Sequence, residues 1–250
     1  MSKLTAELMG RKLRQRLAKR WQPIFETIAG RLVEAYGVPH LGNFDDPVDE
    51  VFYIMLSART TDAQYQKTHS LLRSRFPTLD SLAEAEISEI VPCIADGGLA
   101  NKRAAHARNL AAALVRCGED ASARLRSMPA REAYYFLVNL PGMGPKSAFC
   151  VMMYSLGHDV FPVDVNVQRV AARVGALRKN LKHYQAQQQL PPLVPAGRSR
   201  ELHIGMVVLG RKICLPRSPR CEECPIEDLC ATGRERRRRK PIGGGKKGRH

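Results

Sequence analysis

The chain has 250 residues, of which 44% are hydrophobic, and its formal net charge is +16 at neutral pH. This length and apolar content suffice for one large domain or two small ones and exclude a chain that is disordered throughout. The charge favours a polyanionic partner, because clustered Lys and Arg release counterions when they bind one. The sequence has no apolar run of about 18 residues and no apolar N-terminal core, which excludes membrane-spanning and secreted proteins.

Apolar residues recur at helical spacing along most of the chain, and no period-2 alternation persists long enough to predict a strand. The sequence therefore predicts an all-α protein. The expected helices cover residues 5–20, 25–36, 47–58, 62–75, 80–91, 101–117, 130–139, 145–156, 165–175 and 202–213. Residues 178–199 are rich in Gln, Pro and basic residues and are expected to form a linker with at most a short helix.

The first of these helices, 5–20, is basic and has only a narrow apolar stripe, formed by Met9, Leu13 and Leu17 at four-residue spacing. The stripe predicts a docked or partly frayed helix. A solvated charged face and a transit peptide are two further interpretations that the composition leaves open.

A glycine turn with the sequence LPGMGPK occupies residues 140–146, between two predicted helices. Gly142 and Gly144 permit a positive φ and a close approach of a phosphate to the backbone, and Pro145 suits the first position of a helix. The start of such a helix is an anion site. It also disfavours the charged form of Lys146, which makes this amine a candidate nucleophile; the alternative is a glycine-rich turn with a solvated lysine.

Asp164 follows 18 positions after Lys146 and directly precedes the helix predicted for 165–175. An aspartate at this position is expected to cap the helix, because its carboxylate can accept hydrogen bonds from the first backbone N–H groups. Capping would also orient the carboxylate, so a chemical role is compatible with it.

Four of the seven cysteines form a C-x6-C-x2-C-x5-C pattern. They are Cys214, Cys221, Cys224 and Cys230. Four thiolates in one compact loop predict a metal centre in a reducing compartment rather than disulfides. Zinc and an iron–sulfur cubane each take four thiolates, and the spacing leaves both open. Cys93, Cys117 and Cys150 stand singly in apolar helical stretches and are expected to be core residues.

The end of the chain is strongly basic, since residues 234–250 carry nine Lys or Arg and one Glu. Such a segment cannot bury apolar surface, so residues 232–250 are expected to be disordered. The tail would hold DNA or RNA loosely or serve solubility alone.

The glycine turn, Asp164 and the cysteine loop, in this order, resemble the helix-hairpin-helix DNA glycosylases of the endonuclease III type, over about residues 25–231. The turn resembles the hairpin that carries the catalytic lysine, Asp164 resembles the family's aspartate, and the cysteines resemble the ligands of its [4Fe-4S] cluster. The resemblance implies a two-lobed all-α fold. A helical barrel domain would cover 40–158, and residues 1–39 would pack with an iron–sulfur cluster domain of 159–231.

The resemblance also implies a bifunctional DNA glycosylase and AP lyase of base excision repair, acting on damaged or modified pyrimidines. Lys146 would attack C1′ of the sugar, and Asp164 would deprotonate the amine and stabilise the positive charge on the sugar. The resulting iminium acidifies C2′, so the 3′ phosphate leaves by β-elimination.

The expected partner is double-stranded DNA that contains a damaged or modified base or an abasic site, with no membrane. The protein is expected to be a monomer. Its compartment would be the cytoplasm, at the nucleoid, if the protein is bacterial, and the nucleus and the mitochondrion stay open alternatives.

A base inside a duplex must be flipped out before it can be excised, and two loops are candidates for filling the gap. By resemblance, Arg59 stands where endonuclease III carries a glutamine wedge, and Leu99 lies in the second, leucine-bearing loop beside Lys102. The hairpin residues Gly142, Met143 and Gly144 would grip the DNA backbone. Other interpretations are a phosphate contact for Arg59 and a cover over the core for Leu99.

Two alternatives to this function stay open. Asn166 stands where many endonuclease III proteins carry histidine, and residues 161–167 are also similar to the glycosylase domain of plant 5-methylcytosine DNA demethylases. The other alternative is a non-catalytic iron–sulfur protein that binds DNA or senses redox state. Lys146 argues against an adenine-mismatch glycosylase, because those relatives lack a lysine at this position.

Overall fold

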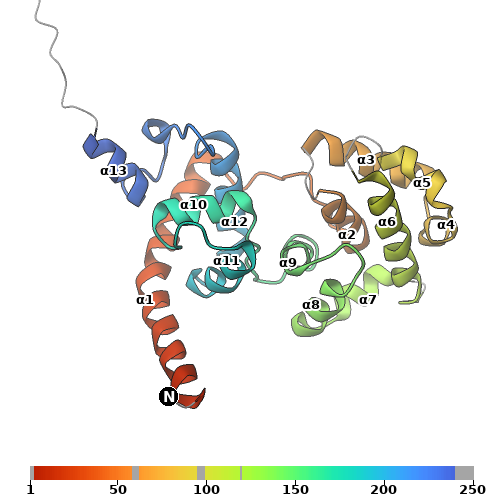
Figure 1. Ribbon diagram of the computed structural model, residues 1–250, viewed down its shortest axis with the longest axis horizontal. Helices are drawn as coiled ribbons and strands as arrows, with labels where there is room; N and C mark the ends of the chain where they lie inside the picture. The colour runs from red at the N-terminus through yellow and green to blue at the C-terminus, as the bar shows by residue number, and fades with distance from the viewer. Residues whose placement is uncertain (1–2, 58–61, 95–98, 119, 240–250) are drawn as a thin grey trace, which may run out of the picture. The chain divides into compact units, whose positions relative to one another are not determined.

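The computed structural model describes residues 3–57, 62–94, 99–118 and 120–239 (Figure 1). Within these residues every regular element is helical, so the prediction of an all-α chain is confirmed. The chain forms two compact units, one of Met1–Pro39 with Val163–His250 and one of His40–Pro162. No helix in the described part of the chain is both long and apolar enough to span a bilayer.

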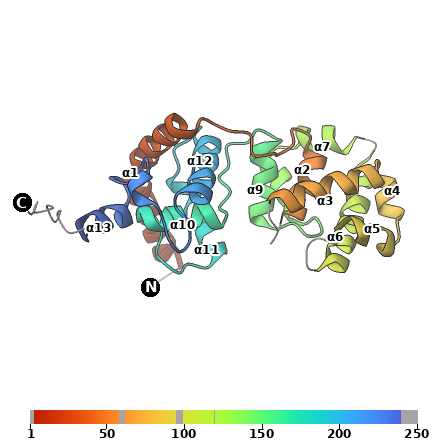
Figure 2. The ribbon, with the colours of Figure 1, turned by 90° about the horizontal axis from the view of Figure 1, so that it is seen from above.

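The His40–Pro162 unit is organised around one apolar helix. Its helices are α2 (Pro47–Leu56), α3 (Asp62–Arg75), α4 (Leu79–Glu84), α5 (Ile87–Ile94), α6 (Ala100–Val115), α7 (Ala121–Ser127), α8 (Ala130–Val138) and α9 (Pro145–Tyr154). All side chains of α2 except Asp49 are buried, and α2 packs against α3, α7 and α9 (Figure 2). A helix that is apolar on nearly all sides belongs at the centre of its unit.

The structure differs from the prediction of a single helix at 80–91. The chain breaks there into α4 and α5, because Ala85 takes an extended conformation with ψ 144°. The Glu89 carboxylate then accepts a hydrogen bond from the Glu86 N–H at 3.0 Å, which offers the backbone an alternative to a continuous helix. Helix α7 was not predicted; it is short and follows its N-cap Asp120, whose side chain accepts a hydrogen bond from the Ala123 N–H.

The other unit is built on a buried helix, α12. Its helices are α1 (Lys3–Tyr36), α10 (Val165–Val174), α11 (His183–Gln189), α12 (Ser199–Lys212) and α13 (Ala231–Arg239), with the short 3-10 helices η1 (Pro191–Leu193) and η2 (Cys221–Glu223). Helix α12 packs against α1 and α10. A Cβ at Gly205 would lie 2.7 Å from Leu32 Cβ, so glycine is needed for this close approach of α12 to α1.

Helix α1 is continuous where two helices were predicted. Pro23 lies inside it, and the Thr27 hydroxyl donates to the Pro23 carbonyl at 3.0 Å. Proline removes one backbone hydrogen bond, but the buried Trp21 and Phe25 on either side of it pack into the core. Tertiary packing therefore outweighs the local cost.

The predicted disorder of 232–250 is wrong for its first residues, which form α13. The Arg236 guanidinium donates to the Pro219 carbonyl at 3.0 Å, and the Arg234 side chain donates to the Asp228 carbonyl at 3.0 Å. These bonds tie the helix to the preceding cysteine loop, a contact that composition alone does not reveal. Residues 240–250 lie outside the described part of the chain.

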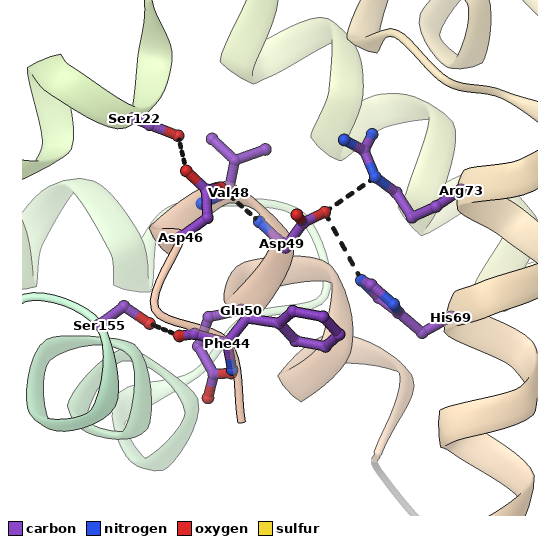
Figure 3. A network of polar contacts seen from close by, with 9 residues as sticks. All are labelled: Phe44, Asp46, Val48, Asp49, Glu50, His69, Arg73, Ser122 and Ser155. Atoms are coloured by element: carbon purple, nitrogen blue, oxygen red, sulfur yellow. Dashed lines mark hydrogen bonds and ion pairs between the residues drawn. The ribbon is translucent and has the colours of Figure 1, made fainter. Parts of the chain in front are cut away.

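A network of polar contacts fixes the loop that leads into α2 (Figure 3). Glu50 is fully buried and accepts hydrogen bonds from the Asn43 side chain at 2.6 Å and from the Phe44 N–H at 2.8 Å. The Ser155 hydroxyl donates to the Phe44 carbonyl at 2.7 Å. The loop is thus attached both to α2 and to the end of α9.

The same network joins α2 to α7 and α3. Asp46 caps α2 through the Val48 N–H at 2.9 Å and accepts a hydrogen bond from the Ser122 hydroxyl at 2.6 Å. Arg73 Nε lies 2.8 Å from a carboxylate oxygen of Asp49. That oxygen is 3.7 Å from Nε2 of His69, whose pKa is lowered, chiefly by burial.

We predict that Glu50→Ala lowers the free energy of unfolding by about 2 to 4 kcal/mol, because it leaves the half-buried donors of Asn43 and Phe44 without their buried acceptor. Urea unfolding measures the loss. Glu84→Ala removes an exposed glutamate of α4 and should change stability by less than about 0.5 kcal/mol. Equal stabilities for the two variants would contradict a structural role for Glu50.

Candidate functional site

The glycine turn of 140–146 forms a tight hairpin between α8 and α9. Gly142 has φ +77°, and the Met143 N–H donates to the Leu140 carbonyl at 3.0 Å. A Cβ at Gly142 would lie 3.0 Å both from Nδ1 of His106 on α6 and from Cγ of Met55 on α2. Both the backbone angle and the neighbouring side chains therefore require glycine at 142.

Lys146 is the second residue of α9, after Pro145 at the first helical position. Gly144 is the N-cap residue, and because glycine has no side chain it caps the helix only through its carbonyl, which accepts a hydrogen bond from the Ala148 N–H at 2.9 Å. The side chain of Lys146 is half-buried. The helix start predicted from the sequence is thus present, and the binding of a phosphate to it stays a prediction.

Asp164 is the N-cap of α10, as predicted. One carboxylate oxygen accepts the Val167 N–H at 2.7 Å, and the other accepts a hydrogen bond from the Asn166 side-chain amide at 3.2 Å. Arg169 donates to the amide oxygen of Asn166 at 2.7 Å, which orients the amide N–H toward Asp164. The half-buried carboxylate is therefore held on both of its oxygens.

Arg169 extends this arrangement to α12 and to the cysteine loop, a link that was not predicted. It donates to the carbonyls of Gly210 and Cys214, both at 2.8 Å. Burial lowers the pKa of this guanidinium, and the nearby Cys214 opposes that effect. A Cβ at Gly210 would lie 2.7 Å from Cβ of Asn166. One sequence signal for Arg169 is its position as a cation in a helix with a strongly apolar face.

The four predicted ligand cysteines line one pocket. Cys214, Cys221, Cys224 and Cys230 surround it together with Arg173, Ile213, Pro219, Glu227, Thr232 and Gly233. In the described residues no three His, Cys, Asp or Glu side chains converge as the ligands of one metal ion do. Four thiols around one pocket fit the four-thiolate ligand set of an iron–sulfur core.

The chemistry of the pocket also fits a cationic centre. Burial raises the pKa of the Cys224 thiol to about 11, and the charges of the other three cysteines add to this effect. Burial likewise raises the pKa of Cys230. A bound metal centre would provide the positive charge that thiolates need in such surroundings.

Arg173 on α10 binds both ends of the cysteine loop and was also missed. Its guanidinium donates to Sγ of Cys214 at 3.1 Å and to the Leu215 carbonyl at 2.7 Å. Its own carbonyl lies 3.2 Å from Sγ of Cys230. The spacing of Arg169 and Arg173, one helical turn apart, is the signal that could have placed both on the side of α10 that faces the loop.

The residues predicted to contact DNA are described in part. Arg59 lies outside the described residues. Leu99, the N-cap residue of α6, has φ +73° and is 60% exposed, which is unusual for a large apolar side chain. Lys102 is exposed in the first turn of α6, and Met143 is half-buried in the hairpin. Their contacts with DNA stay predictions.

Of the three remaining cysteines, Cys93 lies in α5, Cys150 lies in α9 and Cys117 lies in the turn that follows α6. Cys150 is buried, whereas Cys93 and Cys117 are half-buried. Burial raises the pKa of the thiols of Cys93 and Cys117. The prediction of a core residue thus holds fully for Cys150 and in part for the other two.

Comparison with known proteins gives a match for the region that contains the hairpin and another for the cysteine loop. Residues 52–195 match the model of the HhH-GPD superfamily of base excision DNA repair proteins, and residues 214–230 match the iron–sulfur binding domain of endonuclease III. Endonuclease III of Escherichia coli is 30% identical over 75% of this chain and 85% of its own length. The thymine/uracil-DNA glycosylase of Methanothermobacter thermautotrophicus is 29% identical over 74% of this chain and 82% of its own.

A solved structure gives the same result for the fold. The trapped covalent intermediate of endonuclease III with DNA superimposes with a TM-score of 0.73 at 25% identity, over 85% of this chain and 98% of that chain.

We predict that Gly142→Ala destabilises the protein by about 1 to 3 kcal/mol, because alanine is strained at φ +77° and its Cβ would press on His106 and Met55. Thermal unfolding measures the change. Gly144→Ala is the matched control, since a Cβ there would meet nothing within 4 Å. The prediction fails if both variants unfold at the temperature of the wild type.

Proposed function

This chain belongs to the HhH-GPD superfamily of base excision DNA repair proteins, and we propose that it is a bifunctional DNA glycosylase and AP lyase that uses Lys146 as its nucleophile. It is an endonuclease III-like glycosylase. The observation that carries the finer proposal is the place of Lys146 in the first turn of α9, directly after the Gly142 hairpin. The similarity to an endonuclease III trapped as a covalent intermediate with DNA supports it.

The proposed reaction begins with the amine of Lys146. Asp164 takes a proton from this amine, whose nitrogen then bonds to C1′ while the glycosidic bond breaks and the base leaves with the electron pair of that bond and a proton from water. The sugar ring opens and a Schiff base forms. Loss of a C2′ proton then expels the 3′ phosphate by β-elimination, and hydrolysis of the Schiff base frees Lys146.

The hydrogen bonds around Asp164 suit this role. The Val167 N–H and the Asn166 amide hold one oxygen each of the carboxylate, which would accept the proton and stabilise positive charge on the sugar. The cap also fixes the direction of the carboxylate. Asp164 would therefore act without a conformational change of its own.

We assign the two units to the domains expected from the sequence. The His40–Pro162 unit would be the helical barrel domain, which presents the hairpin, and the other unit would be the iron–sulfur cluster domain. DNA contacts would come from Gly142, Met143 and Gly144 at the hairpin, and from Lys102. Arg59 and Leu99 would fill the gap left by the flipped base.

The cofactor is a [4Fe-4S] cluster, in keeping with the match to the iron–sulfur binding domain of endonuclease III. Its ligands would be the four cysteines that line the pocket. The cluster would cross-link the loop and so stabilise the surface next to α10. The residues proposed for bond cleavage include none of these cysteines.

The proposed substrate is a damaged pyrimidine in duplex DNA. A 5-methylcytosine-type base is the second candidate, because Asn166, the residue shared with the plant demethylase domain, bonds directly to Asp164. Excision from a panel of duplexes with oxidised, methylated and mismatched pyrimidines would distinguish the two. A protein that binds all of these duplexes but excises no base would be the non-catalytic alternative.

We predict that borohydride traps the wild-type protein covalently on abasic DNA and that Lys146→Gln lowers the yield of adduct on the order of 100-fold or more, because the proposed Schiff base forms on the amine that this variant removes. Lys67→Gln, which neutralises an exposed lysine of α3, should trap as the wild type does. An undiminished adduct with Lys146→Gln would refute the lyase assignment.

We predict that the purified protein is yellow-brown and holds about four iron atoms per chain. Cys224→Ala should lose most of the iron, as measured by visible absorption and metal analysis, because one ligand is missing. Cys117→Ala, at a half-buried cysteine outside the loop, should keep it. A colourless wild-type protein that contains zinc would contradict the assignment.

A further inference from the structure

Helix α1 consists of two parts that differ in how they are stabilised. From Trp21 onward it is anchored, since Trp21, Phe25, Ile28 and Leu32 are at most 7% exposed. Residues 11–20 include no buried side chain. Figure 1 shows the N-terminal turns of α1 extending past the other helices of their unit. We call residues 11–20 the basic arm.

The basic arm concentrates positive charge. Its cations are Arg11, Lys12, Arg14, Arg16, Lys19 and Arg20, and it contains no acidic residue. Among the side chains that the structure describes, from residue 11 onward, none forms an ion pair with these cations. Arg20 lies over the Trp21 ring at 5.4 Å. The anchored part of α1 is different, because Glu26 pairs with Arg198 at 2.7 Å and Arg31 pairs with Asp228.

The spacing of these cations makes the arm unfavourable by itself. Lys12, Arg16 and Arg20 are four residues apart and Lys19 lies beside them, so they share one face of the helix. Like charges at this spacing destabilise a helix by about 0.2 to 0.5 kcal/mol per pair. Pro23 also removes one of the backbone hydrogen bonds that join the arm to the anchored turns. A polyanion bound along this face would offset the repulsion between its cations.

We propose that the basic arm is an additional binding surface for duplex DNA that contacts backbone phosphates without regard to sequence or base damage. A membrane is a poorer match, because the arm has no aromatic residue and its apolar side chains are limited to Leu13, Leu17 and Ala18. The surface goes beyond the proposed excision activity. It would hold the protein on undamaged DNA between lesions.

The test is the salt dependence of binding to an undamaged duplex, measured by fluorescence anisotropy. Each phosphate contact contributes about 0.9 to the slope of log K against log salt. The test variant carries Lys12→Gln, Arg16→Gln, Lys19→Gln and Arg20→Gln. The magnitude of its slope should be smaller by about 3, and it should bind at least about tenfold more weakly at low salt. Glutamine keeps the helix propensity of the segment.

The matched control keeps the charge and exchanges the residue types, as Lys12→Arg, Arg16→Lys, Lys19→Arg, Arg20→Lys. It should bind like the wild type. Because Arg20 contacts Trp21, a triple glutamine variant that retains Arg20 is compared as well, together with thermal unfolding of every variant. The triple variant should lose about 2 to 3 from the slope at an unchanged unfolding temperature.

Hydrogen exchange on the full chain gives a local measurement. Undamaged duplex should increase amide protection in peptides from residues 11–20 and leave peptides from 25–36 unchanged. Unaltered protection and an unaltered slope would overturn the proposal. Loss of binding to anionic vesicles, with DNA binding intact, would assign the arm to membranes and overturn it too.

The outcome is independent of the proposed function. Single-turnover excision at saturating duplex should be the same in the wild type and the glutamine variants, because the arm acts on binding alone. If no variant excises any base while the slopes still differ, the arm stands and the glycosylase proposal falls. If excision at saturation falls in the glutamine variants alone, the arm belongs to the reaction site and the proposal is wrong.

Discussion

The hydrogen bonds from two arginines of α10 to the cysteine loop are the interaction on which the Val163–His250 part of the chain depends. Arg169 and Arg173 donate to the carbonyls of Cys214 and Leu215, and Arg173 also reaches Sγ of Cys214. The loop has little regular structure of its own, so its backbone acceptors need donors from outside it. Helix α10 supplies these donors from one side, one helical turn apart.

The same helix begins at Asp164, and this explains why its orientation matters for chemistry. Asn166 joins the carboxylate to Arg169, while Arg169 joins Asn166 to the cysteine loop. A displacement of the cysteine loop would therefore act on the Asp164 carboxylate through the side chains of Arg169 and Asn166. Gly210 permits the approach, because a Cβ there would overlap Asn166. The site proposed for catalysis and the site proposed for the cluster thus share one supporting helix.

In the His40–Pro162 unit the corresponding constraint is steric. Gly142 is exposed, but a Cβ there would lie 3.0 Å from side-chain atoms of His106 and Met55, so α6 and α2 restrict this position in addition to the turn itself. The buried Glu50 holds the entry to α2 in place. Lys146, the proposed nucleophile, follows a turn in which the backbone angle and the neighbouring side chains both restrict residue 142.

The sequence by itself determined the helical class, the hairpin at 140–146, the cap at Asp164 and the grouping of four cysteines, because each rests on local spacing or on a backbone preference of glycine, proline or aspartate. Only the tertiary structure decided that α1 continues through Pro23, that α13 is helical, and that Arg169 and Arg173 serve the cysteine loop. These outcomes depend on contacts between residues far apart in the chain, where buried packing and paired hydrogen bonds outweigh local propensity. Local patterns specify what a segment can form, and long-range contacts select which of its side chains meet.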